Sequence, residues 1–457
     1  MRKRILTIRD VSERQLCTGC GACAYIAPDR YEMVDDQDLG RRPLSVASNT
    51  GSPSVETEQE AMFVCPGHSL EHDFHRSDPE LIDELVADWG PVYRMWEGYA
   101  GDSEVRWSGS SGGASTALAL YCLEKELMYG TLHIAPRQDR PYLNETVLST
   151  TRGELLAATG SRYAPASPCD GLDMVESASG PCVFIGKPCD VAAVQRARRI
   201  RPRLDERLGL TIAFFCAGTP STKGTLALLK SVGIDNPDRV VGMRYRGEGW
   251  PGRWTVRVQT DNASVEEFSM SYEDSWGLLQ AHRQWRCYIC PDHTGEFADV
   301  AVGDPWYRSI EPGEAGSSLI LARTKEGRRM VEQAAEAGYL VLREVTYDFL
   351  PRSQPNLLKT RGRLWGQLLV LRILGAPTPR YRGMPTFRVW WSVLGWTEKL
   401  RSVGGTAKRV FNKGLLTRVS VNNMAPVSNP GSDETGPPRL EGMPTRDTQR
   451  SAQPQED

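Results

Sequence analysis

Three cysteines near the N-terminus are spaced to bind an iron–sulfur cluster. Cys17, Cys20 and Cys23 form a C-x2-C-x2-C run, with Gly19 and Gly21 between them. Thiolates at this spacing hold three irons of a cubane. The backbone must coil tightly to bring them together, and glycine permits this because it reaches positive φ at little steric cost. The run therefore predicts three of the four ligands of a [4Fe-4S] cluster.

The fourth ligand has to come from elsewhere in the chain. A bacterial ferredoxin run continues with x3-C-P, whereas this chain has Ala27-Pro28 at those positions. We expect Cys65 to supply the missing thiolate. His68, His72 and His75 follow it closely and are alternative ligands, although they also suit a solvated linker. A structural zinc site is the other interpretation of closely spaced cysteines.

Four later cysteines could form a second site. Cys287 and Cys290 make a C-x2-C pair, which alone fits half of a zinc site, a redox dithiol or half of a cluster site. Cys189 and Cys216 each follow a short apolar run. Ligands of open α/β sheets bind at the carboxyl ends of strands, so these cysteines could meet there as an all-cysteine site. Cys122 suits the apolar side of a helix, and Cys169 and Cys182 carry no assignment.

A serine- and glycine-rich loop is a candidate anion site. Residues 107–113 read Trp-Ser-Gly-Ser-Ser-Gly-Gly and lead into an apolar helix expected over 114–127. The free backbone N–H groups and the positive end of the helix dipole would favour a cofactor phosphate. The loop matches neither the P-loop nor the G-x-G-x-x-G spacing. A tight helix start packed against a neighbouring segment explains it equally well.

The elements that would position these residues alternate along the chain. Short apolar runs predict strands at 132–134, 181–186, 210–216, 299–303 and 318–322. Helical patterns follow several of them, as after Cys189 and over 225–231. Strands buried on both faces and separated by helices indicate an α/β fold.

Composition limits the class of protein. The 457 residues suit two or three domains. A net charge of −2 does not suggest a protein that binds nucleic acid as a whole. The charged N-terminus lacks the apolar core of a secretory signal, and no apolar run is long enough to span a bilayer. We therefore expect a cytoplasmic protein whose eleven cysteines serve metal binding or catalysis rather than disulfides.

Several motifs together resemble one known family, the coenzyme F420 hydrogenase/dehydrogenase beta-subunit family. It includes deazaflavin-reducing beta subunits and 7-hydroxymethyl chlorophyll a reductase. The resemblance runs from about Met1 to Val345, and the motifs keep the family's order. They are the loop at 107–113, Thr-Gly-Ser-Arg-Tyr at 159–163, Gly-Lys-Pro-Cys at 186–189, Phe-Phe-Cys-Ala-Gly-Thr-Pro-Ser at 214–221, Arg-Cys-Tyr-Ile-Cys-Pro-Asp at 286–292 and the segment 298–304.

The resemblance implies FAD beside a [4Fe-4S] cluster. Its cluster ligands would be Cys189, Cys216, Cys287 and Cys290, which makes two clusters with the N-terminal one. The implied flavin-binding residues are Ser110, Ser111, Gly112, Gly113, Thr159, Gly160, Arg162 and Tyr163. Arg162 would pair with a phosphate or substrate. The chain departs from the family at Asp190, where relatives often have glutamine, and a charge there would shift the potential of a cluster.

These inferences predict four parts in the chain. They are a ferredoxin-like [4Fe-4S] module (1–75), an α/β domain that binds FAD and a [4Fe-4S] cluster (90–345), a helical basic and aromatic extension (346–420) and a disordered tail (421–457). Between Cys23 and Cys65 the sequence is polar and turn-rich, with little apolar material for a core.

The expected function is that of an iron–sulfur flavoprotein oxidoreductase. It would pass single electrons from ferredoxin or another redox protein through two clusters to FAD, and on to an organic two-electron acceptor. One alternative is an electron-input subunit of a larger complex, which oxidises or reduces coenzyme F420 and has no substrate of its own. A more distant alternative is a zinc-stabilised binding protein. The sequence assigns no catalytic residue, substrate, direction of electron flow or oligomeric state.

The extension carries a separate signal. Residues 387–418 combine aromatic residues such as Trp396 with lysines and arginines. An amphipathic stretch of this kind can lie on an anionic membrane surface. It can equally be a helix docked on its own domain or on a partner subunit.

Overall fold

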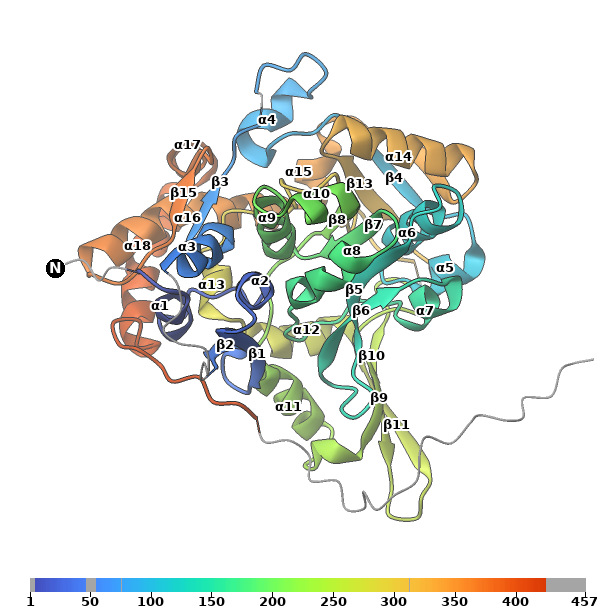
Figure 1. The fold of residues 1–457 in the computed structure, drawn as a ribbon, viewed down its shortest axis with the longest axis horizontal. Coiled ribbons are helices and arrows are strands. Elements are labelled where there is room, and N and C mark those ends of the chain that lie inside the picture. The colour runs from blue at the N-terminus through green and yellow to red at the C-terminus, as the bar shows by residue number, and fades with distance from the viewer. Residues whose placement is uncertain (1–4, 47–54, 75, 312, 425–457) are drawn as a thin grey trace, which may run out of the picture. The chain divides into compact units, whose positions relative to one another are not determined.

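A mixed sheet of eight strands confirms the expected α/β fold (Figure 1). The computed structural model describes residues 5–46, 55–74, 76–311 and 313–424. The strand order is β14-β4-β13-β12-β8-β7-β5-β6, in which β12, β8, β7 and β5 run parallel. The strands are β4 (Arg94–Ala100), β5 (Gly130–Pro136), β6 (Asn144–Ser149), β7 (Cys182–Gly186), β8 (Leu208–Phe214), β12 (Val300–Gly303), β13 (Ser318–Ala322) and β14 (Leu340–Glu344). All five strands expected from the apolar runs are present.

Helices cover both faces of this sheet. Adjacent residues of β7 point into different cores, because side chains alternate along a strand. Val183 packs in the cluster that contains Leu118 of α6 (Ala114–Glu124), together with residues of α14 (Lys325–Glu336). Phe184 packs in the cluster that contains Val191 of α9 (Pro188–Ala197), together with residues of α8 (Leu172–Ser177). Burial on both faces explains why these strands read as continuous apolar runs.

A second, antiparallel sheet of three strands carries its own core. Its order is β11-β10-β9, and the strands are β9 (Val240–Arg244), β10 (Arg253–Gln259) and β11 (Val265–Ser271). Trp254 and Val256 of β10 pack with Leu228 of α11 (Thr222–Ser231) and Leu279 of α12 (Tyr272–Gln280). Between residues 83 and 353 the chain also contains the short helices α4 (Asp83–Trp89), α5 (Ser103–Ser108), α7 (Arg152–Ala157), η1 (Pro168–Gly171), α10 (Pro202–Arg207), η2 (Pro237–Arg239), α13 (Trp285–Tyr288) and α15 (Phe349–Ser353).

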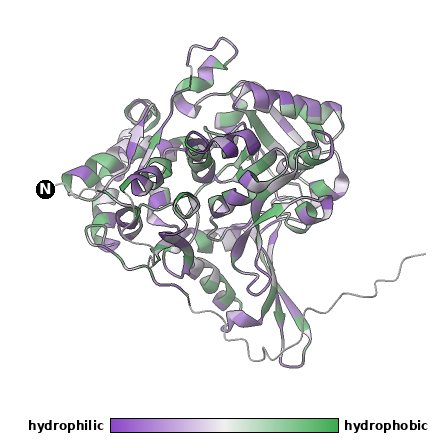
Figure 2. Cartoon of the chain, in the orientation of Figure 1, coloured by the Kyte–Doolittle hydropathy of each residue, from purple (hydrophilic) through white to green (hydrophobic). Residues whose placement is uncertain are grey.

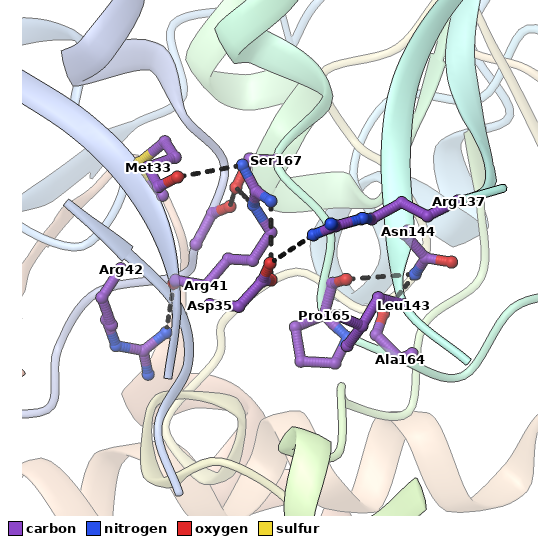
Figure 3. Close-up of polar contacts among 12 residues, drawn as sticks. Met33, Asp35, Arg41, Arg42, Arg137, Leu143, Asn144, Ala164, Pro165 and Ser167 are labelled. Atoms are coloured by element: carbon purple, nitrogen blue, oxygen red, sulfur yellow. Dashed lines mark hydrogen bonds and ion pairs between the residues drawn. The ribbon is translucent and has the colours of Figure 1, made fainter. Parts of the chain in front are cut away.

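The N-terminal segment has more regular structure than its polar sequence suggests. It contains α1 (Ile8–Glu13), α2 (Ala22–Ile26), the hairpin β1 (Tyr31–Asp36) and β2 (Gly40–Ser45), and α3 (Val55–Val64). The hairpin is tied to the large sheet's domain by polar contacts (Figure 3). Arg41 Nε donates to Ser167 Oγ at 3.0 Å, and Arg137 pairs with Asp35 at 3.2 Å. The segment shares a core with α9 rather than having a separate one, since Val11 belongs to the same cluster.

The C-terminal extension folds back onto the rest of the chain. It consists of α16 (Pro355–Ile373), β15 (Arg380–Arg382), α17 (Thr386–Val393) and α18 (Trp396–Asn412), and β15 pairs with β3 (Ser69–Glu71). Beyond α18, Arg418 forms ion pairs with Asp10 and Glu13 of α1. The backbone N–H of Asn422, at the start of the expected disordered tail, donates to Asp36 at 2.8 Å. The rest of that tail, from 425 onward, lies outside the described residues. Within those residues no helix has the length and hydropathy required to cross a membrane.

Candidate functional site

The N-terminal cysteines lie near Cys65; we call Cys17, Cys20, Cys23 and Cys65 the outer set. Burial raises the pKa of the Cys23 thiol, and the neighbouring Cys17, Cys20 and Cys65 raise it further. Burial also raises the pKa of Cys65 to about 12, with contributions from Cys20 and Cys17. Charges affect one another more strongly at short range, so these mutual effects indicate that the four thiols are neighbours. Gly21, at φ +93°, starts α2 between two of the cysteines.

A fifth cysteine, which the sequence left unassigned, lies beside this set. The backbone N–H of Cys169 donates to the carbonyl of Cys20 at 2.9 Å. A hydrogen bond from its thiol lowers the pKa of Cys20. Cys169 Sγ also lies 3.5 Å from the carbonyl oxygen of Asp190. A lone cysteine in a loop gives no sequence signal for such a position.

The nearby histidines have other partners. His68 Nδ1 lies 3.3 Å from the carbonyl of Met62. His72 Nε2 lies 3.2 Å from the carbonyl of Glu296, and its ring stacks on Phe297 at 4.5 Å between centroids. His75 lies outside the described residues. Of the candidates for the fourth position, Cys65 is the one that the structure brings to the other thiols.

The four later cysteines also meet, although they are far apart in sequence; we call Cys189, Cys216, Cys287 and Cys290 the inner set. Cys189 lies at the start of α9, after β7, and Cys216 follows β8. Burial raises the pKa of Cys216 to about 12, to which Cys287 and Cys290 contribute. Burial likewise raises the pKa of Cys189, and the neighbouring Asp190, Cys216 and Cys290 add to this. Parallel strands ending at one edge bring Cys189 and Cys216 together.

Both sets fit a cubane in their donor chemistry. Each offers four thiols, and backbone N–H groups donate to sulfur in both: Gly19 to Cys17 and Thr219 to Cys287, each at 3.3 Å. Hydrogen bonds to sulfur of this kind tune cluster potentials. In the described part of the chain, no group of three or more His, Cys, Asp or Glu side chains is placed to hold a single metal ion. A cubane places each cysteine on a different iron, so its ligands need not converge on one point.

Arg286 lies between the two sets. Its Nη2 donates to the carbonyl of Pro66, next to Cys65, at 3.0 Å. Burial lowers the pKa of Arg286. Tyr381 and the inner-set thiols, Cys290 among them, raise it, and the net shift is upward. On the other side it lowers the pKa of Cys17, against the effect of burial. The side chain is 2% exposed, and its Nε has no partner among the described residues. It thus places one buried positive charge within reach of both sets.

Asp190, at the position where the resemblance leads us to expect glutamine, is neutralised by its neighbour. Its carboxylate pairs with Lys187 Nζ at 2.7 Å and accepts the Lys187 backbone N–H at 2.9 Å at the start of α9. Burial opposes the charge of Lys187, but Asp190 and then Cys189 hold its pKa above the ordinary value. Asp190 is fully buried. Any effect of this carboxylate on a cluster therefore acts together with the lysine.

A cavity of about 640 Å³ adjoins the inner set. Its volume is typical of a cofactor or ligand site. Seven of the eight expected flavin-binding residues line it, namely Ser110, Ser111, Gly113, Thr159, Gly160, Arg162 and Tyr163. Cys216 of the inner set lines it as well, as do Ala114, Ser115 and Thr116 in the first turn of α6. The first turn of a helix favours negative charge, and binding of an anion at this end of the cavity stays a prediction.

Gly112 does not line this cavity, and packing accounts for it. At φ +69°, a Cβ on Gly112 would lie 2.7 Å from Ser317 Cα. Gly113, also at φ +69°, would place a Cβ 2.4 Å from the carbonyl of Val105. The structure therefore supports the interpretation of the loop as a tightly packed helix start, and its interpretation as an anion site stays a prediction. The glycines permit close packing, and the same turn starts α6 at the cavity.

Arg162 is engaged by the protein itself. Its Nη2 donates to the carbonyls of Pro141 and Leu143 at 2.6 and 3.2 Å, and its Nη1 donates to the carbonyl of Met243 at 3.1 Å. Its Nε donates to Asn144. Burial lowers its pKa. These contacts tie the loop to β6 and β9, and the expected pairing with a phosphate stays a prediction.

A second buried arginine, which sequence reasoning missed, orients the serine-rich loop. Arg246 forms a two-pronged ion pair with Asp304, at 2.7 and 3.0 Å, and donates to the carbonyl of Ser110 at 2.7 Å. Its guanidinium lies 4.7 Å from the ring centre of Tyr272, which stacks on Trp306 at 5.8 Å. All of these side chains line the cavity. They give it a flat aromatic wall.

His293 offers a hydrogen-bonding atom with no partner. Its Nδ1 lies 2.8 Å from the carbonyl of Cys216, so Nδ1 carries the proton and Nε2 is left as an acceptor. Burial lowers its pKa to about 4, which keeps the ring neutral. His293 lines the cavity, and its buried Nε2 has no partner among the described residues. A buried polar atom of this kind calls for a donor from a ligand or water, and a flavin carries such N–H and hydroxyl donors.

Comparison with known proteins shows the family of this chain. Two family models match, described as coenzyme F420 hydrogenase/dehydrogenase beta subunit N-terminus, over residues 95–172, and C-terminus, over residues 181–348. The coenzyme F420 hydrogenase subunit beta of Methanosarcina barkeri is 25% identical over 52% of this chain and 77% of its own length. That of Methanococcus voltae is 27% identical over 61% of this chain and 95% of its own length. A chain of the F420-reducing [NiFe] hydrogenase complex from Methanosarcina barkeri aligns with a TM-score of 0.46 and 21% identity, over 59% of this chain and 89% of that chain.

Proposed function

Because the chain belongs to the coenzyme F420 hydrogenase/dehydrogenase beta-subunit family, we propose that it is an iron–sulfur flavoprotein oxidoreductase. It passes single electrons between a ferredoxin-like redox protein and FAD through two [4Fe-4S] clusters, and exchanges two electrons with an organic substrate or a deazaflavin. The outer set binds one cluster, the inner set binds the other, and the cavity binds FAD. When bound, a flavin exchanges single electrons with clusters and hydride equivalents with organic molecules.

The observation that carries this proposal is the position of Cys216. This residue belongs to the inner set and also lines the cavity, as does the start of α6. A cluster ligand and a flavin site are thereby adjacent, which short-range electron transfer requires. The outer set connects to the inner one through Arg286 and through Cys169, which contacts both Cys20 and Asp190.

The chain's own residues have defined tasks in this proposal. The first turn of α6 binds the flavin pyrophosphate, and the aromatic wall of Tyr272 and Trp306 excludes water. Arg246 holds the Ser110 loop in place. His293 Nε2 accepts a hydrogen bond from the flavin and fixes its orientation beside Cys216.

The second candidate function is that of an electron-input subunit without its own substrate. The names of the relatives favour it, since those of Methanosarcina barkeri and Methanococcus voltae are hydrogenase subunits. The two functions differ in what the isolated chain does. An autonomous reductase turns over an organic acceptor by itself, whereas an input subunit exchanges electrons with coenzyme F420 and needs a partner chain for further turnover.

Anaerobic purification of the full chain tests the proposal directly. We expect a brown protein with about eight irons, matching acid-labile sulfide and one FAD. Stopped-flow reduction of the flavin with reduced ferredoxin, and separately with reduced coenzyme F420, distinguishes the two functions. A colourless protein with stoichiometric zinc would overturn both and support the zinc-stabilised alternative.

A further inference from the structure

Helix α18 presents a stripe of apolar residues to solvent, whereas three of its four buried residues are polar. The outward stripe consists of Trp396, Leu400, Val403 and Phe411, which are 70%, 72%, 37% and 65% exposed. Their spacing places them along one side of the helix. The inward side carries the polar residues Lys399, Ser402 and Thr406 and one apolar residue, Val410, all buried. An ordinary surface helix shows the opposite arrangement, so the exposed stripe needs an apolar environment outside this part of the chain.

Helix α17 extends the same apolar surface. Phe387 and Trp391 are 51% and 57% exposed. The Trp391 ring lies 6.3 Å, between centroids, from both Phe387 and Trp396, so the aromatic residues of the two helices are continuous. Hydrophobic and hydrophilic residues alternate along α16, α17 and α18 in Figure 2. Scattered single apolar residues are normal on a surface, but a continuous patch indicates an interaction.

The buried Lys399 holds the indoles in their outward position. Its Nζ donates to the carbonyl of Trp391 at 2.9 Å. The same ammonium lies 4.7 Å from the ring centre of Trp391, 4.8 Å from that of Trp396 and 5.3 Å from that of Trp390. A cation over several aromatic rings fixes them at little entropic cost. The exposed aromatic surface is therefore organised in advance of binding.

The charge around this surface has one sign. Residues 386–413 contain six basic residues, Arg388, Lys399, Arg401, Lys408, Arg409 and Lys413, and one acidic residue, Glu398. The whole chain has a net charge of −2, so this excess is local. Glu398 is engaged by Arg363 at 3.6 Å, which reduces its effect. The surface is complementary to a partner that is apolar in its interior and anionic at its boundary.

We propose that α17 and α18 bind the anionic lipid surface of a membrane. Trp391, Trp396 and Leu400 enter the boundary between headgroups and acyl chains, and the exposed arginines and lysines lie at the level of the lipid phosphates. Aromatic side chains are favoured at that boundary, and basic residues are attracted to anionic lipids. The binding is peripheral. It rests on these helices alone and does not depend on the redox function proposed above.

Vesicle flotation with the full-length, anaerobically purified protein tests this inference. Vesicles of equimolar phosphatidylcholine and phosphatidylglycerol should bind the protein, with a blue shift of tryptophan emission, and vesicles of pure phosphatidylcholine should bind it weakly. Replacing Trp391 and Trp396 by serine should lower the partition coefficient about tenfold for each residue. Arg401→Glu with Lys408→Glu should lower it about fivefold for each charge removed.

Matched variants keep the result interpretable. Arg401 and Lys408 are exposed, so their replacement should leave folding, iron content and flavin content unchanged. Val265→Ser, at a 56% exposed apolar residue of β11, should bind vesicles like the unaltered protein. The proposal is overturned if the charged vesicles fail to bind, if the serine and glutamate variants bind as well as the original, or if the surface instead pairs two copies of the chain in sedimentation analysis.

Discussion

The outer and inner cysteine sets offer the same four thiols but are assembled in opposite ways. Three outer cysteines lie within seven residues of chain, and all four are buried, at 6% to 8% exposure. The inner cysteines come from three separate segments and are half-buried, and one of them lines the cavity. The outer site is therefore mainly a property of a local segment, whereas the inner site is a property of the sheet edge. Their tasks should differ accordingly, with the outer set exchanging electrons with a redox partner and the inner set serving the flavin.

The largest effect is expected from replacing Cys65, which should remove the outer cluster and leave the inner one in place. Cys65→Ser should remove about four irons per chain while FAD stays bound, because the inner set and the cavity are untouched. Reduction of the flavin by the external one-electron donor should be lost. Iron and flavin analysis measure this.

Cys169→Ser is the matched control, since Cys169 also lies next to Cys20 but outside the spacing pattern. It should keep the full iron content. If instead Cys65→Ser keeps its iron and Cys169→Ser loses it, the fourth outer ligand is Cys169 and the assignment from sequence is wrong.

The next largest effect is expected on the rate of flavin reduction when a cysteine of the inner set is replaced. Cys290→Ala should leave the outer cluster intact and slow flavin reduction by a one-electron donor at least about tenfold. Direct hydride exchange between the flavin and a two-electron partner should change less, since it bypasses the clusters. Stopped-flow absorbance follows both reactions. Cys122→Ala, in the apolar core of α6, should alter neither rate, and equal slowing of both reactions by Cys290→Ala would contradict the proposed order of electron transfer.

Replacing Arg286 should affect the two sets alike, because its charge lies near both of them. A positive charge stabilises the more negative, reduced state of a cluster, so Arg286→Met should lower both midpoint potentials by about 50–100 mV. Potentiometric titration followed by electron paramagnetic resonance measures each cluster separately.

Arg42→Met is the one-sided control. Burial raises the pKa of Cys17, and Arg42 opposes this more strongly than Arg286 does. Its removal should lower the outer potential alone. A shift of both potentials with Arg42→Met, or of only one with Arg286→Met, would contradict the central position assigned to Arg286.

The smallest effect concerns the flavin side of the inner set. His293→Leu removes the unpartnered acceptor and should weaken FAD retention about threefold to tenfold. Iron content should stay unchanged, since the His293 ring contacts Cys216 only at its carbonyl, and the bond from the Cys216 N–H to the His293 carbonyl does not involve the replaced side chain. His68→Leu, remote from the residues that line the cavity, serves as the control for loss of a partly buried imidazole. Unchanged flavin affinity in His293→Leu would remove this residue from the binding site.

Some features of the fold could be predicted from local pattern, and others could not. The five apolar strands were predictable because burial on both faces leaves a continuous apolar run. The hairpin of β1 and β2 was not, because its polar sequence packs onto another segment through Arg41 and Ser167 rather than around a core of its own. The pairing of β15 with β3 joins segments that carry no mutual signal.

The sequence by itself determined the residue types of both cysteine sets, the outer spacing and the start of α6. These depend on residue type and on neighbours within one or two turns of chain. Only the tertiary structure decided that Cys169 lies beside Cys20, that Arg286 contacts both sets, and that His293 Nε2 at the cavity meets no partner among the described residues. It also decided which side of α18 faces solvent. Each of these depends on contacts between distant segments, and amino-acid pattern along a chain carries no record of which distant partner a side chain will meet.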